Sequence, residues 1–152
     1  LQGDLDAARE LAEQRAAAHK TFTPQELADR FPLFADLTLE QREVLLLHFE
    51  LRTAEPGERI FRAGDQSDGV YFISKGEVEV SIAGRQIKLG AGDVFGEMAL
   101  LGPGRRQATV TTTSPARVLV LFGEDFPRLQ AAHPDIAAQL EVVVQKRLDQ
   151  LS

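Results

Sequence analysis

The clearest indication of the fold comes from residues 70–82, VYFISKGEVEVSI. The first four residues are β-branched or aromatic, which is typical of a strand. After Lys75-Gly76, which has the composition of a turn, residues 77–82 alternate strictly between polar and apolar side chains. This alternation predicts a strand with one buried face and one exposed face. We therefore expect two consecutive strands joined by a tight turn.

Further short strands are indicated on both sides of this segment. Turns rich in glycine, proline or aspartate separate them, at residues 56–57, 64–69, 83–84, 90–93 and 114–115. The strands between these turns are predicted at residues 59–61, 85–89, 107–113 and 117–122. Short strands separated by turns at intervals of about eight to twelve residues indicate a sandwich or a roll.

Helices are indicated before and after the predicted strands. Thr23-Pro24-Gln25-Glu26 and Thr38-Leu39-Glu40-Gln41 both have the composition of a capping box, in which a threonine begins a helix. Residues 123–132 and 134–151 return to helical spacing, and the longer segment carries one apolar stripe. At ~1.5 Å per residue the last helix is about 27 Å long, so its stripe needs a surface to cover.

The charge of the chain is acidic overall but unevenly distributed. Its 152 residues include 17 Lys and Arg against 23 Asp and Glu, a formal net charge of −6. A protein that binds long nucleic acids needs a positive field, so this balance argues against direct nucleic-acid binding by the chain. Residues 98–123 are the exception, because they contain Arg105, Arg106 and Arg117 and no acidic residue. Such a window suits a small anion.

Cysteine and histidine, which many catalytic and metal sites require, are missing from the predicted strands. The chain has no cysteine, which excludes disulfides and thiolate metal sites. Its three histidines, His19, His48 and His133, all lie outside the strand region 60–122. The serines of that region therefore have no histidine close in sequence that would serve as a base. We expect no metal site, no cofactor and no enzymatic activity.

The segment around Arg106 has features that suit a phosphate ester. Gly96 lets the backbone approach a ligand closely, because it has no Cβ. Residues 97–101 are expected to form one helical turn whose free N–H groups point at an anion. Arg106 follows the bend at residues 102–104, and its planar guanidinium can pair two phosphate oxygens. We expect Glu97 to be the only acidic residue near this cationic site and to accept hydrogen bonds from a sugar hydroxyl.

Together these residues resemble the phosphate-binding cassette of cyclic nucleotide-binding domains. The resemblance rests on residues 95–100, FGEMAL, on Arg106 nine residues after Glu97, and on Ala108-Thr109-Val110 behind it. It extends over residues 31–151 and includes the segments Phe31-Pro32-Leu33-Phe34, Pro56-Gly57, Gly64-Asp65, Gly76-Glu77-Val78-Glu79-Val80 and Asp125-Phe126. The family includes regulatory subunits of cyclic-AMP-dependent kinase, catabolite-activator-type transcription factors and cyclic-nucleotide-regulated channels.

The resemblance implies an α+β fold that is mainly β. The expected architecture is an antiparallel double-stranded β-helix jelly roll (β-roll) flanked by N- and C-terminal helices. Residues 1–30 would be a helical linker segment, and residues 31–152 would form the cyclic nucleotide-binding domain. Within that domain the roll is expected at residues 50–122 and the C-terminal lid helices at residues 123–151.

The resemblance also assigns roles to individual residues. Glu97 would bind the ribose 2′-hydroxyl, Arg106 the cyclic phosphate, and Val80 would pack against the base. Backbone N–H groups would complete the cradle around Gly96, Met98, Ala99 and Ala108. The last helix acts in the family as a lid, and its purine contacts are expected at Val143, Lys146 and Arg147.

Two positions depart from the family pattern. The residue before the key arginine is often proline, but here it is Arg105. The phosphate-binding residue could therefore be either arginine, and the spacing from Glu97 favours Arg106. Gln107 stands where a Thr or Ser would favour cyclic GMP by bonding the guanine. Cyclic AMP is therefore the favoured ligand, and cyclic GMP is the alternative.

The expected function is that of a sensor which signals through its last helix to an effector domain of the parent protein. We expect a cytoplasmic domain that regulates a channel, transporter or enzyme, including a membrane-embedded one, with a homo-oligomer as one form of assembly. One alternative is a degenerate roll that binds no nucleotide and serves as a protein-interaction or oligomerisation module. Another is the sensor half of a transcription factor whose DNA-binding part is missing from the chain.

Overall fold

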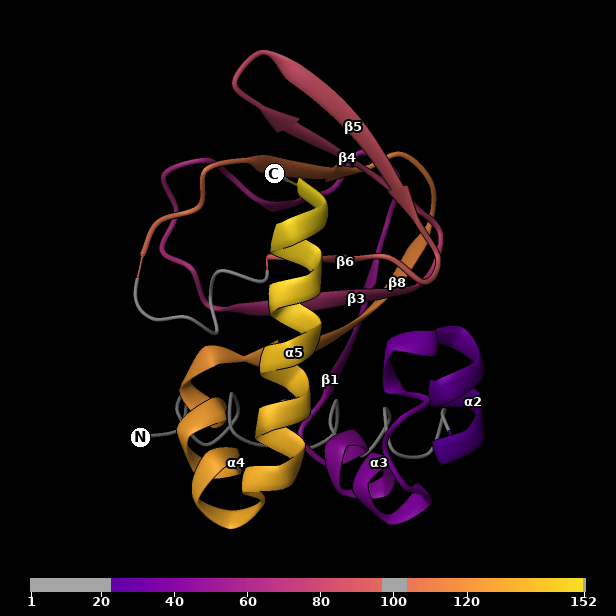
Figure 1. The fold of residues 1–152 in the computed structure, drawn as a ribbon. Coiled ribbons are helices and arrows are strands. Elements are labelled where there is room, and N and C mark those ends of the chain that lie inside the picture. Colours follow the sequence, from indigo (N-terminus) through magenta and orange to yellow (C-terminus); the bar gives the residue numbers. More distant parts are fainter. Residues whose placement is uncertain (1–22, 97–103, 152) are drawn as a thin grey trace, which may run out of the picture.

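The computed structural model describes residues 23–96 and 104–151, which form a β-roll with a group of helices packed at one end (Figure 1). The first elements are α2 (Pro24–Arg30), the 3-10 turn η1 (Pro32–Phe34) and α3 (Leu39–Leu46). The strands are β1 (Glu50–Ala54), β2 (Arg59–Phe61), β3 (Gly69–Lys75), β4 (Glu77–Ile82), β5 (Arg85–Gly90), β6 (Val94–Phe95), β7 (Thr109–Thr112) and β8 (Ala116–Phe122). The last elements are the turn η3 (Gly123–Asp125), α4 (Phe126–Ala132) and α5 (Pro134–Leu151). The predicted mainly β, α+β fold is confirmed.

The strands form two sheets that face each other. One sheet has the strand order β1-β8-β3-β6 and the other has the order β2-β7-β4-β5. Neighbouring strands run antiparallel in both sheets. Strand β3 is buried along six consecutive residues because its sheet lies between the other sheet and the helices. This placement explains the continuous apolar run at the start of the segment 70–82.

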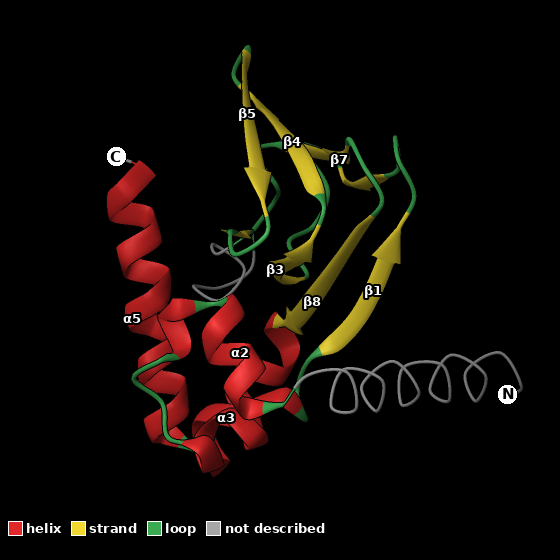
Figure 2. Cartoon of the chain, turned by 90° about the vertical axis from the view of Figure 1, so that its right-hand side faces the viewer, coloured by secondary structure: helices red, strands yellow, loops and turns green. Residues whose placement is uncertain are grey.

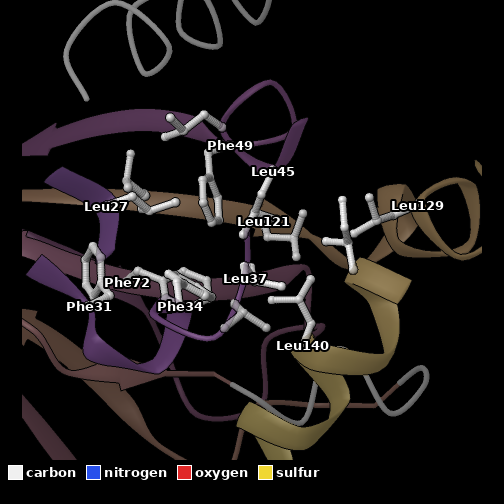
Figure 3. Packing of buried hydrophobic residues seen from close by; sticks show 14 of the residues in the cluster. Leu27, Phe31, Phe34, Leu37, Leu45, Phe49, Phe72, Leu121, Leu129 and Leu140 are labelled. Carbon is white, nitrogen blue, oxygen red and sulfur yellow. The ribbon is translucent and has the colours of Figure 1, made fainter. Parts of the chain in front are cut away.

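The larger core cluster lies between the first sheet and the helices (Figure 3). At its centre is Phe72 of β3, whose ring centroid lies 5.8 Å from that of Phe31 and 5.3 Å from those of Phe34 and Phe49. Leu27 of α2 is fully buried in the same cluster, so this helix contributes to the core. The division expected at residues 30 and 31 stays a prediction.

The second core cluster fills the space between the two sheets. Its buried members are Tyr71, Ile73, Val78, Phe95, Val110, Val118 and Val120. Phe61 of β2 and Val80 of β4 pack against the cluster from positions that are only partly buried. The interior of the roll is thus apolar, and any polar group that enters it needs a partner.

The capping signals at the two N-terminal helices are found at the expected residues. The Thr38 hydroxyl accepts from the backbone N–H of Gln41 at 3.1 Å, and the Thr38 N–H donates to Oε1 of Gln41 at 2.9 Å. This reciprocal pair confirms the predicted capping box of α3. The Thr23 hydroxyl accepts from the N–H of Glu26 at 3.1 Å and begins α2.

The strand expected at residues 107–113 was predicted too long. It spans only Thr109–Thr112, because Gln107 and Ala108 form a bend before it and Thr113 lies in a second bend after it. The residues before the bend are held elsewhere: Arg106 donates its backbone N–H to Asp65 at 2.7 Å and accepts from the N–H of Gly64 at 2.8 Å. The backbone of Arg106 is therefore bonded to the loop at Gly64 and Asp65, and pairing within the sheet begins only at Thr109.

Helix α5 extends from the group of helices along the side of the roll (Figures 1 and 2). Its first turn is tied to α3, because Nε2 of Gln41 donates to the carboxylate of Asp135. Ile136 and Leu140 anchor the helix in the larger core cluster. Among the described residues, no helix combines the length and the apolar character needed to cross a membrane.

Candidate ligand-binding site

The two neighbouring arginines of the cationic window lie in different environments. Arg106 is buried, with 6 % of its surface exposed. Arg105 is exposed, and its Nη1 donates to the backbone oxygen of Gly64 at 2.9 Å. The structure therefore turns Arg106 towards the interior of the roll and leaves Arg105 at the surface.

Three acceptors hold the Arg106 guanidinium. Its Nη2 donates to Oδ1 of Asp68 at 2.7 Å and to the backbone oxygen of Gly69 at 2.8 Å. Its Nη1 donates to the backbone oxygen of Gly96 at 3.3 Å, which is the longest of the three contacts. These acceptors come from the residue before β3, from the first residue of β3 and from the residue after β6, so the guanidinium joins two parts of the chain.

Aromatic rings from the roll interior support the same guanidinium. Its central carbon lies 4.0 Å from the ring centroid of Phe61 and 5.6 Å from that of Tyr71. Such cation–π contacts favour a buried guanidinium, which is more weakly hydrated than an ammonium group. The plane of the Arg106 side chain is therefore fixed by packing as well as by hydrogen bonds.

One nitrogen of the guanidinium has no acceptor among the residues that the structure describes. The Nε of Arg106 is buried and lacks a hydrogen-bond partner there. A buried donor without a partner costs about 1–3 kcal/mol, and more when it belongs to a charged group. An anionic ligand oxygen would supply the missing acceptor.

Gly96 lies against this guanidinium in a conformation that favours glycine. Its φ is +82°, in the left-handed region. A Cβ at this position would lie 2.7 Å from Nη1 of Arg106 and 3.0 Å from the backbone oxygen of Gly69. The absence of a side chain at Gly96 therefore allows the arginine to come close to the backbone.

The structure describes some of the other residues expected at the site and not the rest. Val80 faces the roll interior, opposite Val110 of β7, whereas Gln107 is exposed and Ala108 is half-buried next to Arg106. Glu97, Met98 and Ala99 lie outside the described residues. The positions expected to contact the purine, Val143, Lys146 and Arg147, lie on helix α5. Their side chains are not among those that the structure describes.

The expectation that Glu97 would be the only acidic residue near the cationic site is wrong. Asp68 forms an ion pair with Arg106 at 2.7 Å, although 38 positions separate the two residues in sequence. Tyr71 donates its hydroxyl to the same carboxylate, and burial together with the Asp68 charge raises the pKa of Tyr71 to about 12. The signal available in the sequence was the pair of aspartates in the loop at residues 64–69, whose composition by itself predicts only a turn.

The described residues contain no group of three or more His, Cys, Asp or Glu side chains that could hold a metal ion. The charged centre of the site is instead one guanidinium paired with one carboxylate. This arrangement can bind an anion through the remaining N–H groups of Arg106.

Comparisons with known proteins identify the family of the chain. Residues 51–133 match the protein family described as cyclic nucleotide-binding domain. The chain is 39 % identical over 122 residues to a putative potassium channel protein, RPA4233, of Rhodopseudomonas palustris, covering 78 % of this chain and 30 % of that protein. It is 32 % identical over 123 residues to the cyclic AMP receptor protein of Thermus thermophilus, covering 77 % of this chain and 57 % of that protein. The chain thus spans less than two-thirds of either relative.

A solved structure supports the fold. The crystal structure of a putative cyclic nucleotide-binding protein from Geobacter metallireducens superposes with a TM-score of 0.73 at 23 % identity, covering 86 % of this chain and 99 % of that chain. At this identity the likeness concerns the fold, whereas the matched residues 51–133 cover more than half of the sequence. The chain therefore belongs to the cyclic nucleotide-binding domain family.

Proposed function

We propose that this domain binds a cyclic nucleotide, with cyclic AMP favoured over cyclic GMP, and that binding regulates an effector domain of the parent protein. The observation that carries the proposal is the Arg106 guanidinium, which is buried, fixed in its plane and left with an Nε–H that has no acceptor among the described residues. An oxygen of a phosphate diester has the charge and the geometry that this group requires.

The local charge favours a cyclic phosphate over a phosphate monoester. Asp68 already offsets part of the positive charge of Arg106, because the two groups are 2.7 Å apart. A cyclic phosphate brings one negative charge, whereas a phosphate monoester carries about −1.5 to −2 at neutral pH. The carboxylate of Asp68 therefore repels the monoester more strongly than the cyclic diester.

The remaining contacts of the ligand follow from the resemblance to the family. In this proposal Glu97 accepts from the ribose 2′-hydroxyl, and Val80 lies against the base. Backbone N–H groups around the phosphate come from Gly96, Met98, Ala99 and Ala108. The position of Val80 on the apolar interior of the roll is consistent with contact to a purine ring. Gln107 lacks the short hydroxyl that favours cyclic GMP, which is why cyclic AMP is preferred.

The proposed signal passes through α5. The ligand would bind more tightly when the C-terminal part of this helix lies over the roll and contacts it through Val143, Lys146 and Arg147. Such differential affinity shifts an equilibrium between open and closed forms, and the ratio of the two affinities limits the shift. The fixed end of the helix is supported by the Gln41–Asp135 contact and by the burial of Ile136.

The proposed effector is a channel, transporter or enzyme domain, and the sensor itself is not catalytic. The similarity to a putative potassium channel protein supports a channel, for which the sensor would lie on the cytoplasmic side. The similarity to a cyclic AMP receptor protein supports a second candidate, the sensor part of a transcription regulator. The sequence of the full gene distinguishes the two, because a downstream helix-turn-helix would identify the regulator.

Titration calorimetry of the domain with cyclic AMP, cyclic GMP and 5′-AMP tests the proposal. We expect saturable binding of cyclic AMP, weaker binding of cyclic GMP and the weakest binding of 5′-AMP, because of the charge argument above. Absence of binding to all three nucleotides would refute the proposed function and favour a roll that serves as an interaction module.

Substitution of Arg105 by alanine is expected to change the affinity for cyclic AMP by less than about 3-fold, since exposed charges contribute little. Arg105 is exposed and bonds only the Gly64 carbonyl among the described residues. Calorimetry of the Arg105→Ala variant measures this effect. A loss of affinity of more than about 100-fold, which is the loss expected for the phosphate-binding arginine, would show that Arg105 has this role.

A further inference from the structure

Tyr71 is the only tyrosine of the chain, and its ring fills the space between the two sheets. The residue is 1 % exposed. Its ring is nearly parallel to that of Phe95, with centroids 5.1 Å apart and an angle of 3° between the planes, and it lies 5.6 Å from the ring of Phe61. A phenylalanine would make the same ring contacts, so packing alone does not require the hydroxyl.

The hydroxyl of Tyr71 is bonded to a carboxylate of the candidate site. It donates to Asp68, with distances of 3.2 Å to Oδ1 and 3.4 Å to Oδ2. Oδ1 is also the oxygen that accepts from Nη2 of Arg106 at 2.7 Å. Because half of the Asp68 side chain is exposed, water competes for it and its rotamers are not fixed by burial. The buried hydroxyl is therefore the second contact that restricts this carboxylate.

Tyr71 also contacts two other parts of the site. The Arg106 guanidinium lies 5.6 Å from its ring centroid, and Phe95, on which the ring stacks, directly precedes Gly96. One buried side chain thus touches the carboxylate, the guanidinium and the start of the ligand cradle. A rigid, buried group of this kind can keep a site ready for its ligand, which reduces the ordering cost of binding.

We propose that the Tyr71 hydroxyl is a positioning group for the ligand site, which holds Asp68 in the orientation in which its carboxylate fixes the Arg106 guanidinium. This inference rests on the proposed function, because the anion that Arg106 meets is the cyclic phosphate. The hydroxyl stays protonated at neutral pH, since the pKa of Tyr71 is raised to about 12, and it therefore remains a donor.

The test is the affinity for cyclic AMP of Tyr71→Phe, Asp68→Ala and the double variant. Tyr71→Phe keeps the ring, and we expect its affinity to fall by about 3- to 10-fold, as for the loss of one typical hydrogen bond, because the hydroxyl acts on the ligand only through Asp68. In the Asp68→Ala background, the same substitution is expected to change the affinity by less than about 2-fold, because the hydroxyl acts through Asp68. A purely structural role of the hydroxyl predicts an equal loss in both backgrounds, and that result would overturn the proposal.

Thr113→Val is the matched control. The Thr113 hydroxyl also donates to a carboxylate, that of Glu77 at 2.8 Å, but this pair connects the ends of β7 and β4 in the other sheet and is not part of the site. We expect this variant to bind cyclic AMP with wild-type affinity. If Tyr71→Phe does so as well, while the wild-type domain binds the nucleotide, the positioning role is refuted and the proposed function stands.

A measurement without nucleotide separates the two proposals. The buried Arg106 Nε–H is expected to give a protected proton signal in NMR spectra of the free wild-type domain. Tyr71→Phe should shift this signal and increase its solvent exchange, and Thr113→Val should not. An unchanged Arg106 signal in Tyr71→Phe would overturn the positioning role even if the wild-type domain bound no nucleotide.

Discussion

Replacing Arg106 with alanine is expected to lower the affinity for cyclic AMP by more than about 100-fold, because a charge-assisted, two-point contact with phosphate is lost. The site offers no obvious substitute among the described residues, since the neighbouring Arg105 is exposed and bonded to the Gly64 carbonyl. Calorimetric titration of the variant with cyclic AMP measures the effect.

A lysine at the same position provides the control for charge. Arg106→Lys keeps the positive charge but loses the planar group that contacts Asp68, Gly69 and Gly96. We expect an affinity between those of the wild-type domain and the alanine variant. Both variants must first show the two-state thermal unfolding of a folded domain, because the buried guanidinium also packs on Phe61. Wild-type affinity in a folded Arg106→Ala variant would show that the phosphate binds elsewhere.

Substitution of Gly96 by alanine is expected to lower the affinity for cyclic AMP by about 10-fold or more, the loss of one hydrogen bond to a charged group. The new Cβ would lie 2.7 Å from Nη1 of Arg106, so the guanidinium has to move away from the cradle. The variant also loses about 1–3 kcal/mol of stability, because its φ of +82° is strained for alanine. Calorimetry and thermal unfolding measure the two effects.

Gly84→Ala separates backbone strain from the effect on the site. Gly84 has a φ of +78°, but a Cβ there would meet no atom within 4 Å. This variant should therefore lose stability by an amount similar to that of Gly96→Ala and keep wild-type affinity. Equal losses of affinity in both variants would attribute the effect of Gly96→Ala to strain and not to displacement of Arg106.

The sequence predicted the features that depend on neighbouring residues. The alternation at residues 77–82, the turn at Lys75-Gly76 and the capping box at Thr38 are all local patterns, and the structure contains each of them. The apolar run that begins at Val70 predicted a strand but not the reason for its composition. That reason is the burial of β3 on both faces, which follows from the packing of the whole domain.

The ion pair of the site was beyond the reach of local patterns. Asp68 and Arg106 are brought together because β3 pairs with β6 and the segment before β7 bonds to the loop at residues 64–67. The family resemblance assigned roles to Glu97 and Arg106, which lie in one motif, and none to Asp68. Tyr71 lies in a run whose composition predicts only a strand, and the hydrogen bond from its hydroxyl to Asp68 is seen only in the structure.

The early start predicted for β7 has a similar origin. Residues 107–113 have the composition of a strand throughout, but Gln107 and Ala108 bend because Arg106 is already bonded to Gly64 and Asp65. The bend sets the direction in which Arg106 enters the roll. In a strand that began at residue 107, pairing with a neighbouring strand would have placed Gln107 and Ala108. In the structure, the bend after Arg106 places them.

The central claim is that the buried Arg106 guanidinium receives the cyclic phosphate, and a crystal structure of the domain with cyclic AMP tests it most directly. The predicted result is a phosphate oxygen within about 2.7–2.9 Å of the guanidinium, as expected for a charge-assisted bond, with Nε or Nη1 as the donor. A complex in which the nucleotide is bound, Arg106 keeps only its contacts with Asp68, Gly69 and Gly96, and the phosphate lies elsewhere would contradict the claim.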